Sequence, residues 1–323
     1  MDMLTGTIFQ TSVNLISALG TAVIAVIYFR RVRLERPPVG VFNSRDILMV
    51  LCLLTSLPFL YLIVPSVVLT GFLILTFSSA LYIALRPFLR PRYLWPLIIA
   101  LLIINIIVTE TLLGTRSGWQ LYWVVTDAIV LVAIVGVSNL YVQGGMRLRH
   151  VAWFALFLAC YDAFFSLVVP LSLQLADRFE GQPLDPSIGF TMGPYSANLG
   201  IGDLLVFTLF IVSAYKGFGR RGIVVALLII AIFGALIPSL SPLIIVAFVR
   251  TNNVGIVIPV QTFFGPVAFV AYFLLSRRSK ERSMAQWLSI QAAEGHEPIR
   301  VVRRGPRPIA VPETQTVAEV STN

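Results

Sequence analysis

The sequence predicts an all-α polytopic membrane protein with nine transmembrane helices, and three observations lead to this prediction. Hydrophobic residues make up 57% of the 323 residues and charged residues only 12%, whereas soluble domains contain about 45–50% and about 25%. The apolar residues gather in stretches of about 20 residues, the length that crosses a hydrocarbon core. The basic residues lie mainly between these stretches. This composition excludes soluble enzymes, nucleic-acid-binding domains and disulfide scaffolds.

Nine apolar stretches follow one another over the first 276 residues. No basic residue precedes the first stretch, so we interpret it as a retained helix and not as a cleaved signal peptide. After Ser276 the composition becomes basic and then rich in proline and threonine, which predicts a largely disordered tail over 277–323 with a short amphipathic helix at 286–293. The nine-span membrane domain therefore covers 1–276, and its predicted spans are 10–29, 46–64, 66–85, 94–113, 119–142, 150–170, 198–215, 223–249 and 255–276.

The lysines and arginines predict the orientation of these spans. Seventeen of them lie in the loops after spans one, three, five and seven and just after span nine, while the opposite loops hold only Arg116, Arg178 and Arg250. Because cytoplasmic loops are enriched in basic residues, the N-terminus is predicted outside and the tail in the cytoplasm, which requires an odd number of spans. Topology thus explains the net charge of +9, and no nucleic-acid partner is predicted. The 22 arginines against 2 lysines, and the absence of any Asn-x-Ser/Thr sequence, favour a prokaryotic plasma membrane.

Four acidic residues lie within the predicted spans, where an ionisable side chain is costly unless it has a partner or a function. Glu110 is near the outer end of span four, and Asp127 is about two turns inside span five. Both can reach interfacial water, which favours a structural role. Asp162 and Asp203 lie deeper, each 13 residues from the basic residue that marks the cytoplasmic end of its span. At ~1.5 Å per residue, both carboxylates lie ~20 Å from that boundary.

Matched depth on two consecutive antiparallel spans is what a catalytic pair of carboxylates requires. Two neighbouring carboxylates share a proton, so one can activate water as a base while the other donates a proton to a substrate carbonyl. Two other interpretations also fit the spacing of Asp162 and Asp203. The acids would form a proton or cation relay in a proton-coupled membrane transporter, or a hydrogen-bonded pair that fixes helix packing.

The residues around the two acids carry a more specific signal. Tyr161-Asp162 in span six, followed by Gly200-Ile201-Gly202-Asp203 in span seven, resembles the paired motifs of the presenilin and signal peptide peptidase family of GxGD-type intramembrane aspartyl proteases. The resemblance is specific over about 150–278. It implies a presenilin-like fold with its catalytic spans at about 150–215, in which Asp162 and Asp203 are the catalytic residues.

The resemblance also implies a reaction and a substrate class. Such a protease hydrolyses transmembrane or signal-peptide helices within the lipid bilayer, with no metal or organic cofactor. The sequence offers no zinc motif, because His150 and His296 are isolated and no HExxH occurs. An N-terminus outside is the orientation of the signal peptide peptidases and opposite to that of the presenilins. It implies substrates whose own N-terminus is cytoplasmic.

The third element of the family, a Pro-Ala-Leu motif near the start of span nine, is matched only in part. Pro259-Val260-Gln261 lies four to six residues into the predicted span, with Gln261 in place of the leucine. A proline there leaves carbonyl groups free to pair with an extended substrate. Ordinary helix kinking is the alternative. Pro238-Ser239-Leu240 is closer in letters but falls late in span eight, in the wrong element.

The remaining site residues have two interpretations each. Gly200 and Gly202 either allow a substrate to approach Asp203 or serve close helix packing. Tyr161 either forms a wall or hydrogen bond of the site or is a packing aromatic. Pro170 predicts a break in span six, and the Gly- and Pro-rich segment 174–197 predicts a flexible loop outside the membrane. The resemblance implies that this loop gates or engages the substrate.

Overall fold

The computed structural model describes the larger part of the chain. The described residues are 3–34, 63–167, 178–179, 181–192, 195–241, 259–293 and 299–300, together with positions 48, 49, 52, 53, 55, 56, 59 and 61. Pro170 and the segments 168–177 and 242–258 lie outside them, so the predicted break of span six and the end of span eight lie outside the described residues too.

The described residues are mostly helical. Eight of their helical segments are long and apolar enough to cross a membrane, which confirms an integral membrane protein with several spans. The predicted count of nine is not confirmed, because most of predicted span 46–64 lies outside the described residues, although its described positions are helical. The helices are α1 (Met3–Arg31), α3 (Ser66–Leu85), α4 (Pro91–Leu112), α5 (Arg116–Gln143), α6 (Leu148–Leu167), α8 (Ile201–Phe218), α9 (Arg220–Ile229), which continues through the π-helical turn η1 (Ile230–Leu236) to Ser241, and α11 (Val260–Arg278).

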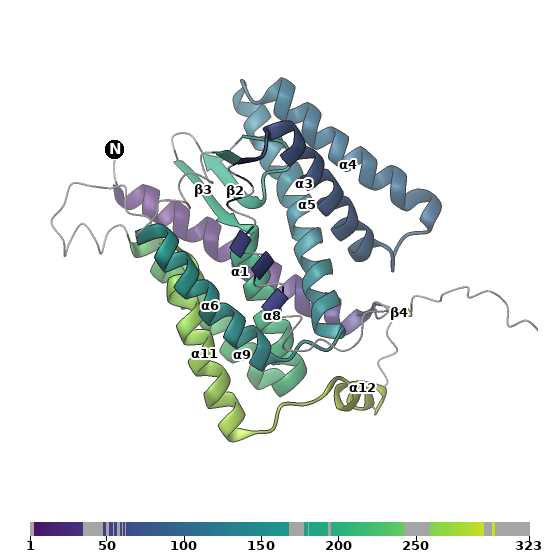
Figure 1. Cartoon of the computed structure of the whole chain (residues 1–323), viewed down its shortest axis with the longest axis vertical. Coiled ribbons are helices and arrows are strands. Elements are labelled where there is room, and N and C mark those ends of the chain that lie inside the picture. Colours follow the sequence, from purple (N-terminus) through teal and green to yellow (C-terminus); the bar gives the residue numbers. More distant parts are fainter. Residues whose placement is uncertain are drawn as a thin grey trace, which may run out of the picture.

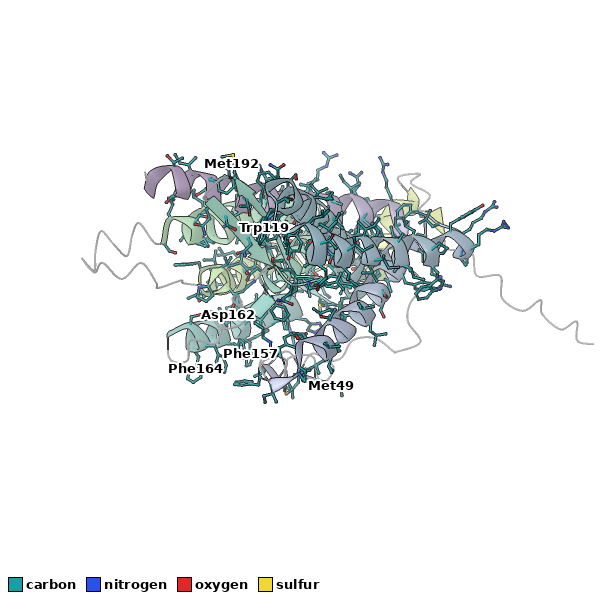
Figure 2. All side chains as sticks on the ribbon, turned by 90° about the horizontal axis from the view of Figure 1, so that it is seen from above. Met49, Trp119, Phe157, Asp162, Phe164 and Met192 are labelled. Atoms are coloured by element: carbon teal, nitrogen blue, oxygen red, sulfur yellow. The ribbon has the colours of Figure 1, made fainter. Side chains whose placement is uncertain are left out.

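Large apolar side chains cover the outside of the bundle. Met49 is 74% exposed, and Phe157 and Phe164 are also exposed. Figure 2 shows these three side chains at the edge of the molecule and not in its interior. So much exposed apolar surface is unfavourable in water and is expected where lipid is the solvent.

The helices form two groups on either side of α1 and α8 (Figure 1). In one group α6 packs along α11, and in the other α3 and α4 pack on α5. α8 contacts α1, α5 and α6 and is the most enclosed of the eight segments, with 72% of its span buried. Buried residues lie on every face of α8 between Leu204 and Phe218, which is typical of a helix at the centre of a bundle.

A two-stranded antiparallel hairpin precedes α8, and the sequence did not predict it. Strand β2 (Ser187–Met192) pairs with β3 (Tyr195–Gly200), with Ser187 opposite Gly200 and Met192 opposite Tyr195. The segment 174–197 was expected to be a flexible loop, and the seventh span was expected to begin at 198. Both predictions were wrong. Residues 187–192 form a strand, residues 198–200 belong to β3, and the helix begins at Ile201. Pairing with β2 satisfies the backbone of 198–200 and so keeps it extended.

The chain after α11 packs against the bundle. The predicted short helix is present as α12 (Met284–Ala293), two residues longer at its start than expected. Its buried Trp287 contacts the ring of Phe29 at 4.5 Å and lies under the Arg33 guanidinium at 4.1 Å. Burial lowers the pKa of Arg33 to about 10, so this side chain stays charged at neutral pH and attracts the indole face. Strand β4 (Ile299–Arg300) pairs in parallel with β1 (Val32–Arg33).

Candidate active site

Helices α6 and α11 approach each other through small residues. A Cβ atom on Gly265 of α11 would lie 2.3 Å from the Ala155 carbonyl oxygen and 2.7 Å from the Ala159 side chain. Trp153 and Phe269 meet at 4.7 Å further along the same contact, so the two helices are antiparallel. Small residues permit this close backbone approach.

This register brings the end of α6 beside the start of α11. Asp162 lies about one turn beyond Ala159, on the face of α6 that contacts α11. Gln261 lies about one turn before Gly265, on the matching face of α11. The antiparallel arrangement therefore places Asp162 and Gln261 at the same end of the contact.

Helix α8 joins this contact through aromatic side chains. The Phe264 ring of α11 contacts the Phe207 ring at 4.6 Å and the Phe210 ring at 5.5 Å. Asp203 lies one turn before Phe207, and Gln261 lies one turn before Phe264. The Asp203 carboxylate and the Gln261 amide consequently face each other.

The three helices thus bring the two predicted catalytic acids together. The charges of Asp162 and Asp203 interact electrostatically, and both side chains are partly buried. Among the described residues, neither carboxylate forms a hydrogen bond except for the approach of Gln261 to Asp203. An acid pair with so few partners retains its capacity to bind water or a substrate.

The start of α8 explains why Asp203 stands where it does. Gly200 is the N-cap in an extended conformation, and Asp203 lies in the first turn. A negative charge is favourable there because the helix dipole is positive at its N-terminus. A Cβ on Gly202 would meet no described atom within 4 Å, and one on Gly200 would meet only the Asp203 carboxylate at 3.8 Å. The described helices therefore do not pack against these glycines, and no described residue fills the space beside them.

Pro259-Val260-Gln261 forms the beginning of α11. Pro259 is the N-cap, extended at φ −61° and ψ 145°, and Val260 is the first helical residue. Residues 255–258, where the predicted span begins, lie outside the described residues, so the predicted distance of this motif from the start of the span stays a prediction. Proline suits a helix start because that position needs no backbone donor.

Gln261 is the least satisfied polar side chain of this region. It is only 2% exposed, and neither its Nε2 nor its Oε1 forms a hydrogen bond of regular geometry, although the amide approaches Asp203. A buried amide without partners is unfavourable by about 1–3 kcal/mol.

Tyr161 forms one hydrogen bond and packs against one aromatic ring among the described residues. Its hydroxyl donates a hydrogen bond to the Thr55 carbonyl at 3.5 Å, and its ring packs on Phe165 at 4.5 Å. Tyr161 therefore connects α6 to Thr55 and packs within α6 against Phe165.

Asp127 anchors the hairpin, a role that the sequence did not reveal. Its Oδ1 accepts a hydrogen bond from the Gly189 amide at 3.0 Å. The neighbouring Trp123 donates from Nε1 to Thr191 Oγ1 at 2.8 Å. Helix α5 thereby holds β2, and through it β3 and the start of α8. Glu110, the other acid in this group of helices, is exposed on α4.

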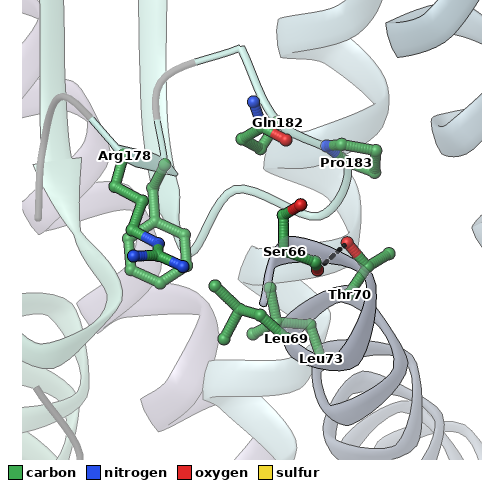
Figure 3. Close-up of a pocket in the computed structure, with 8 residues that line it drawn as sticks. Ser66, Leu69, Thr70, Leu73, Arg178, Gln182 and Pro183 are labelled. Atoms are coloured by element: carbon green, nitrogen blue, oxygen red, sulfur yellow. Dashed lines mark hydrogen bonds between the residues drawn. The ribbon is translucent and has the colours of Figure 1, made fainter. Parts of the chain in front are cut away.

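The other features of the described residues do not compete with this site. No group of three or more His, Cys, Asp or Glu side chains among them could hold a metal ion. A cavity of about 20 Å³ between the start of α3 and residues 178–183 (Figure 3) has room for about one water molecule. There Thr70 donates a hydrogen bond to the Ser66 carbonyl at 3.0 Å, so the helix itself satisfies this hydroxyl.

The chain was also compared with known proteins. No protein-family model matches it, and no curated protein matches it. The conclusions about this site therefore depend on the geometry of Asp162, Asp203 and Gln261.

Proposed function

We propose that this protein is an intramembrane aspartyl endopeptidase with Asp162 and Asp203 as its catalytic residues. The observation that carries the proposal is the convergence of α6, α8 and α11, which brings the two acids together and turns the buried Gln261 amide towards Asp203. The paired sequence motifs Tyr161-Asp162 and Gly200-Ile201-Gly202-Asp203 point to the same chemistry.

The proposed reaction is the hydrolysis of a peptide bond by water. One carboxylate removes a proton from a water molecule, whose oxygen attacks the carbonyl carbon, while the other, protonated acid gives its proton to the carbonyl oxygen. The tetrahedral diol then collapses: the C–N bond breaks, the amine nitrogen takes up a proton, and the new carboxyl terminus leaves. Two neighbouring acids suit these two reaction steps because they hold one proton between them.

The substrate would lie extended beside the start of α11. A helix hides its peptide groups, so a transmembrane segment must unwind locally before water can reach a carbonyl. Residues Pro259 to Gln261 present an extended N-cap and an amide without a hydrogen bond of regular geometry at this point. Segments with Gly, Ser or Pro near the cut should therefore be favoured, and a poly-leucine segment should resist.

The predicted orientation restricts the range of possible substrates further. With the N-terminus outside, in a prokaryotic plasma membrane, α6 runs outward and α8 runs inward. The site is chiral, so it accepts an extended substrate in one direction only. We infer a preference for segments with a cytoplasmic N-terminus, as in signal peptides and type II anchors.

The proposal is tested with purified protein in detergent and a helical peptide, by mass spectrometry of new peptide termini. Asp162→Asn and Asp203→Asn should each lower turnover by at least about 100-fold, because an amide cannot transfer the proton. Glu110→Gln is the matched control, since it removes the charge of an exposed acid in another span. It should cleave at the wild-type rate.

Two results would overturn the proposal. One is cleavage by either Asn variant above about a tenth of the wild-type rate, given the size of general acid–base effects. The other is an absence of cleavage combined with substrate uptake into liposomes that depends on a proton gradient and on the same two acids. That second result would identify a proton-coupled transporter instead.

A further inference from the structure

A cavity of about 360 Å³ opens between the end of α8, the start of α9 and the end of α11. It lies at the far end of α8 and α11 from Asp203 and Gln261, where the last turns of both helices carry basic residues. The residues that line it are Phe218, Arg220, Arg221, Val224, Val225, Leu275, Arg278 and Ser279.

The lining of this cavity divides into a charged part and an apolar part. Arg220, Arg221 and Arg278 are exposed, and no acidic residue lines the cavity with them. Glu281, the acid that follows soon after α11, is engaged elsewhere: its Oε1 accepts a hydrogen bond from the Leu148 amide at 2.7 Å, and its charge acts on Lys216. The three arginine charges are therefore not neutralised by a described acid.

The start of α9 adds backbone donors to the same place. Gly219 is its N-cap, and it offers no side chain to accept from the first amide groups of the helix. Unsatisfied N–H groups and the positive end of the helix dipole favour a phosphate at such a position. The Arg282 guanidinium also lies near, since its Nη1 is 3.3 Å from where a Cβ of Gly219 would be.

We propose that this cavity binds an anionic phospholipid, with the phosphate held by Arg220, Arg221 and Arg278. Arginine pairs with phosphate through two parallel hydrogen bonds, and basic pockets between transmembrane helices suit acidic headgroups. The apolar part of the lining decides between a lipid and free phosphate: Phe218, Val224 and Leu275 offer a surface to an acyl chain and none to a soluble anion. The bound lipid joins the corner between α8 and α9 to the end of α11.

The proposal is tested by titrating phosphatidylglycerol or phosphatidylcholine in mixed micelles into the full-length protein. Bound lipid is counted by native mass spectrometry, and the melting temperature is followed in parallel. Phosphatidylglycerol should bind and raise the melting temperature as its concentration rises, because a ligand of the folded state stabilises it. Phosphatidylcholine should do neither, since its headgroup has no net charge.

Matched variants test whether phosphatidylglycerol binds in this cavity. Arg220→Gln combined with Arg278→Gln should weaken the apparent affinity for phosphatidylglycerol at least about tenfold, as expected for the loss of about 1.4 kcal/mol or more of binding energy. Arg90→Gln combined with Arg92→Gln removes the same charge from exposed residues at the start of α4 and should bind like wild type. Each single exchange, Arg220→Gln and Arg278→Gln, replaces an exposed side chain and gives a folded second test if the double variant is unstable.

Three outcomes would overturn the proposal. Equal weakening in both double variants would show attraction to surface charge without a defined site. Equal stabilisation by inorganic phosphate would show a soluble-anion site. Equal binding of phosphatidylcholine would show that the arginines do not select the headgroup. None of these measurements uses proteolysis, so they are independent of the proposed function.

Discussion

Two regions of the molecule bury acidic and amide side chains. In one region these side chains have hydrogen-bond partners, and in the other region most of them lack such partners. Around the hairpin, Asp127 accepts from the Gly189 amide, and the buried Asp185 accepts from the Tyr122 and Ser187 hydroxyls. Asn105 uses both ends of its amide, donating to Thr126 and accepting from the Leu184 amide. Every acid and amide named here has a partner that fixes the fold.

Where α6, α8 and α11 converge, the same kinds of side chain lack such partners. Asp162 has no hydrogen bond within the described residues, and both amide atoms of Gln261 lack one of regular geometry. The helices there are held instead by the fit of Gly265 against Ala155 and by the ring of Phe264. An acid inside a membrane protein is therefore not evidence of catalysis in itself; the informative observation is an acid that the fold leaves available.

The largest expected effect is the difference between a substitution of Asp203 and a substitution of Asp127. Asp203→Asn should abolish cleavage while leaving the free energy of unfolding unchanged or higher, because removing a desolvated charge relieves a cost. Asp127→Ala should lower the free energy of unfolding by about 1–3 kcal/mol, because it leaves the Gly189 amide without a partner. Its effect on cleavage should stay below about tenfold, the size of a modest loss of positioning.

Unfolding in detergent and peptide turnover, measured on both variants, check this contrast. If Asp203→Asn lost stability as Asp127→Ala does, both acids would have structural roles and the difference between the regions would disappear.

A smaller effect is expected where the helices pack by shape. Gly265→Ala should force α6 and α11 apart, since its Cβ would lie 2.3 Å from the Ala155 carbonyl oxygen. We expect a loss of about 1–3 kcal/mol in the free energy of unfolding. Turnover should fall about 10–100-fold, because the acid pair is then misplaced.

Gly71→Ala is the matched control for this substitution. It lies within α3, and its Cβ would meet no described atom within 4 Å. Its free energy of unfolding should rise by up to about 1 kcal/mol, because alanine has a higher helix propensity than glycine, and its activity should be unchanged. Equal losses in the two glycine variants would mean that close packing at Gly265 is not what positions Asp162.

The smallest effect should come from Gln261. Gln261→Leu removes a buried amide whose only approach is to Asp203, without regular hydrogen-bond geometry, and should raise the free energy of unfolding by about 1 kcal/mol. If the amide binds the substrate backbone, KM should rise about tenfold with kcat less affected, as for a lost ground-state contact. A higher stability with an unchanged KM would assign Gln261 to packing alone.

Several features of this protein follow from the sequence. Stretches of about 20 apolar residues can only be stable in lipid, so the membrane class and most of the spans could be predicted. The prediction that Asp162 and Asp203 lie at matched depth follows from helical rise, because each acid lies on one continuous helix at a fixed distance from a basic residue near the end of that helix. The helix after the basic run, now α12, was also predicted to within two residues of its start.

Other features were decided only by tertiary contacts. The hairpin exists because Gly189 binds Asp127, 62 residues away in sequence, and this contact has no local signal. Helix α8 begins at Ile201, and not at the predicted residue 198, because β2 pairs with the residues before Ile201. Gln261 faces Asp203 because the rings of Phe207 and Phe264 set the register between two helices. A sequence specifies the period and length of each element, but only packing between distant elements determines which of their side chains meet.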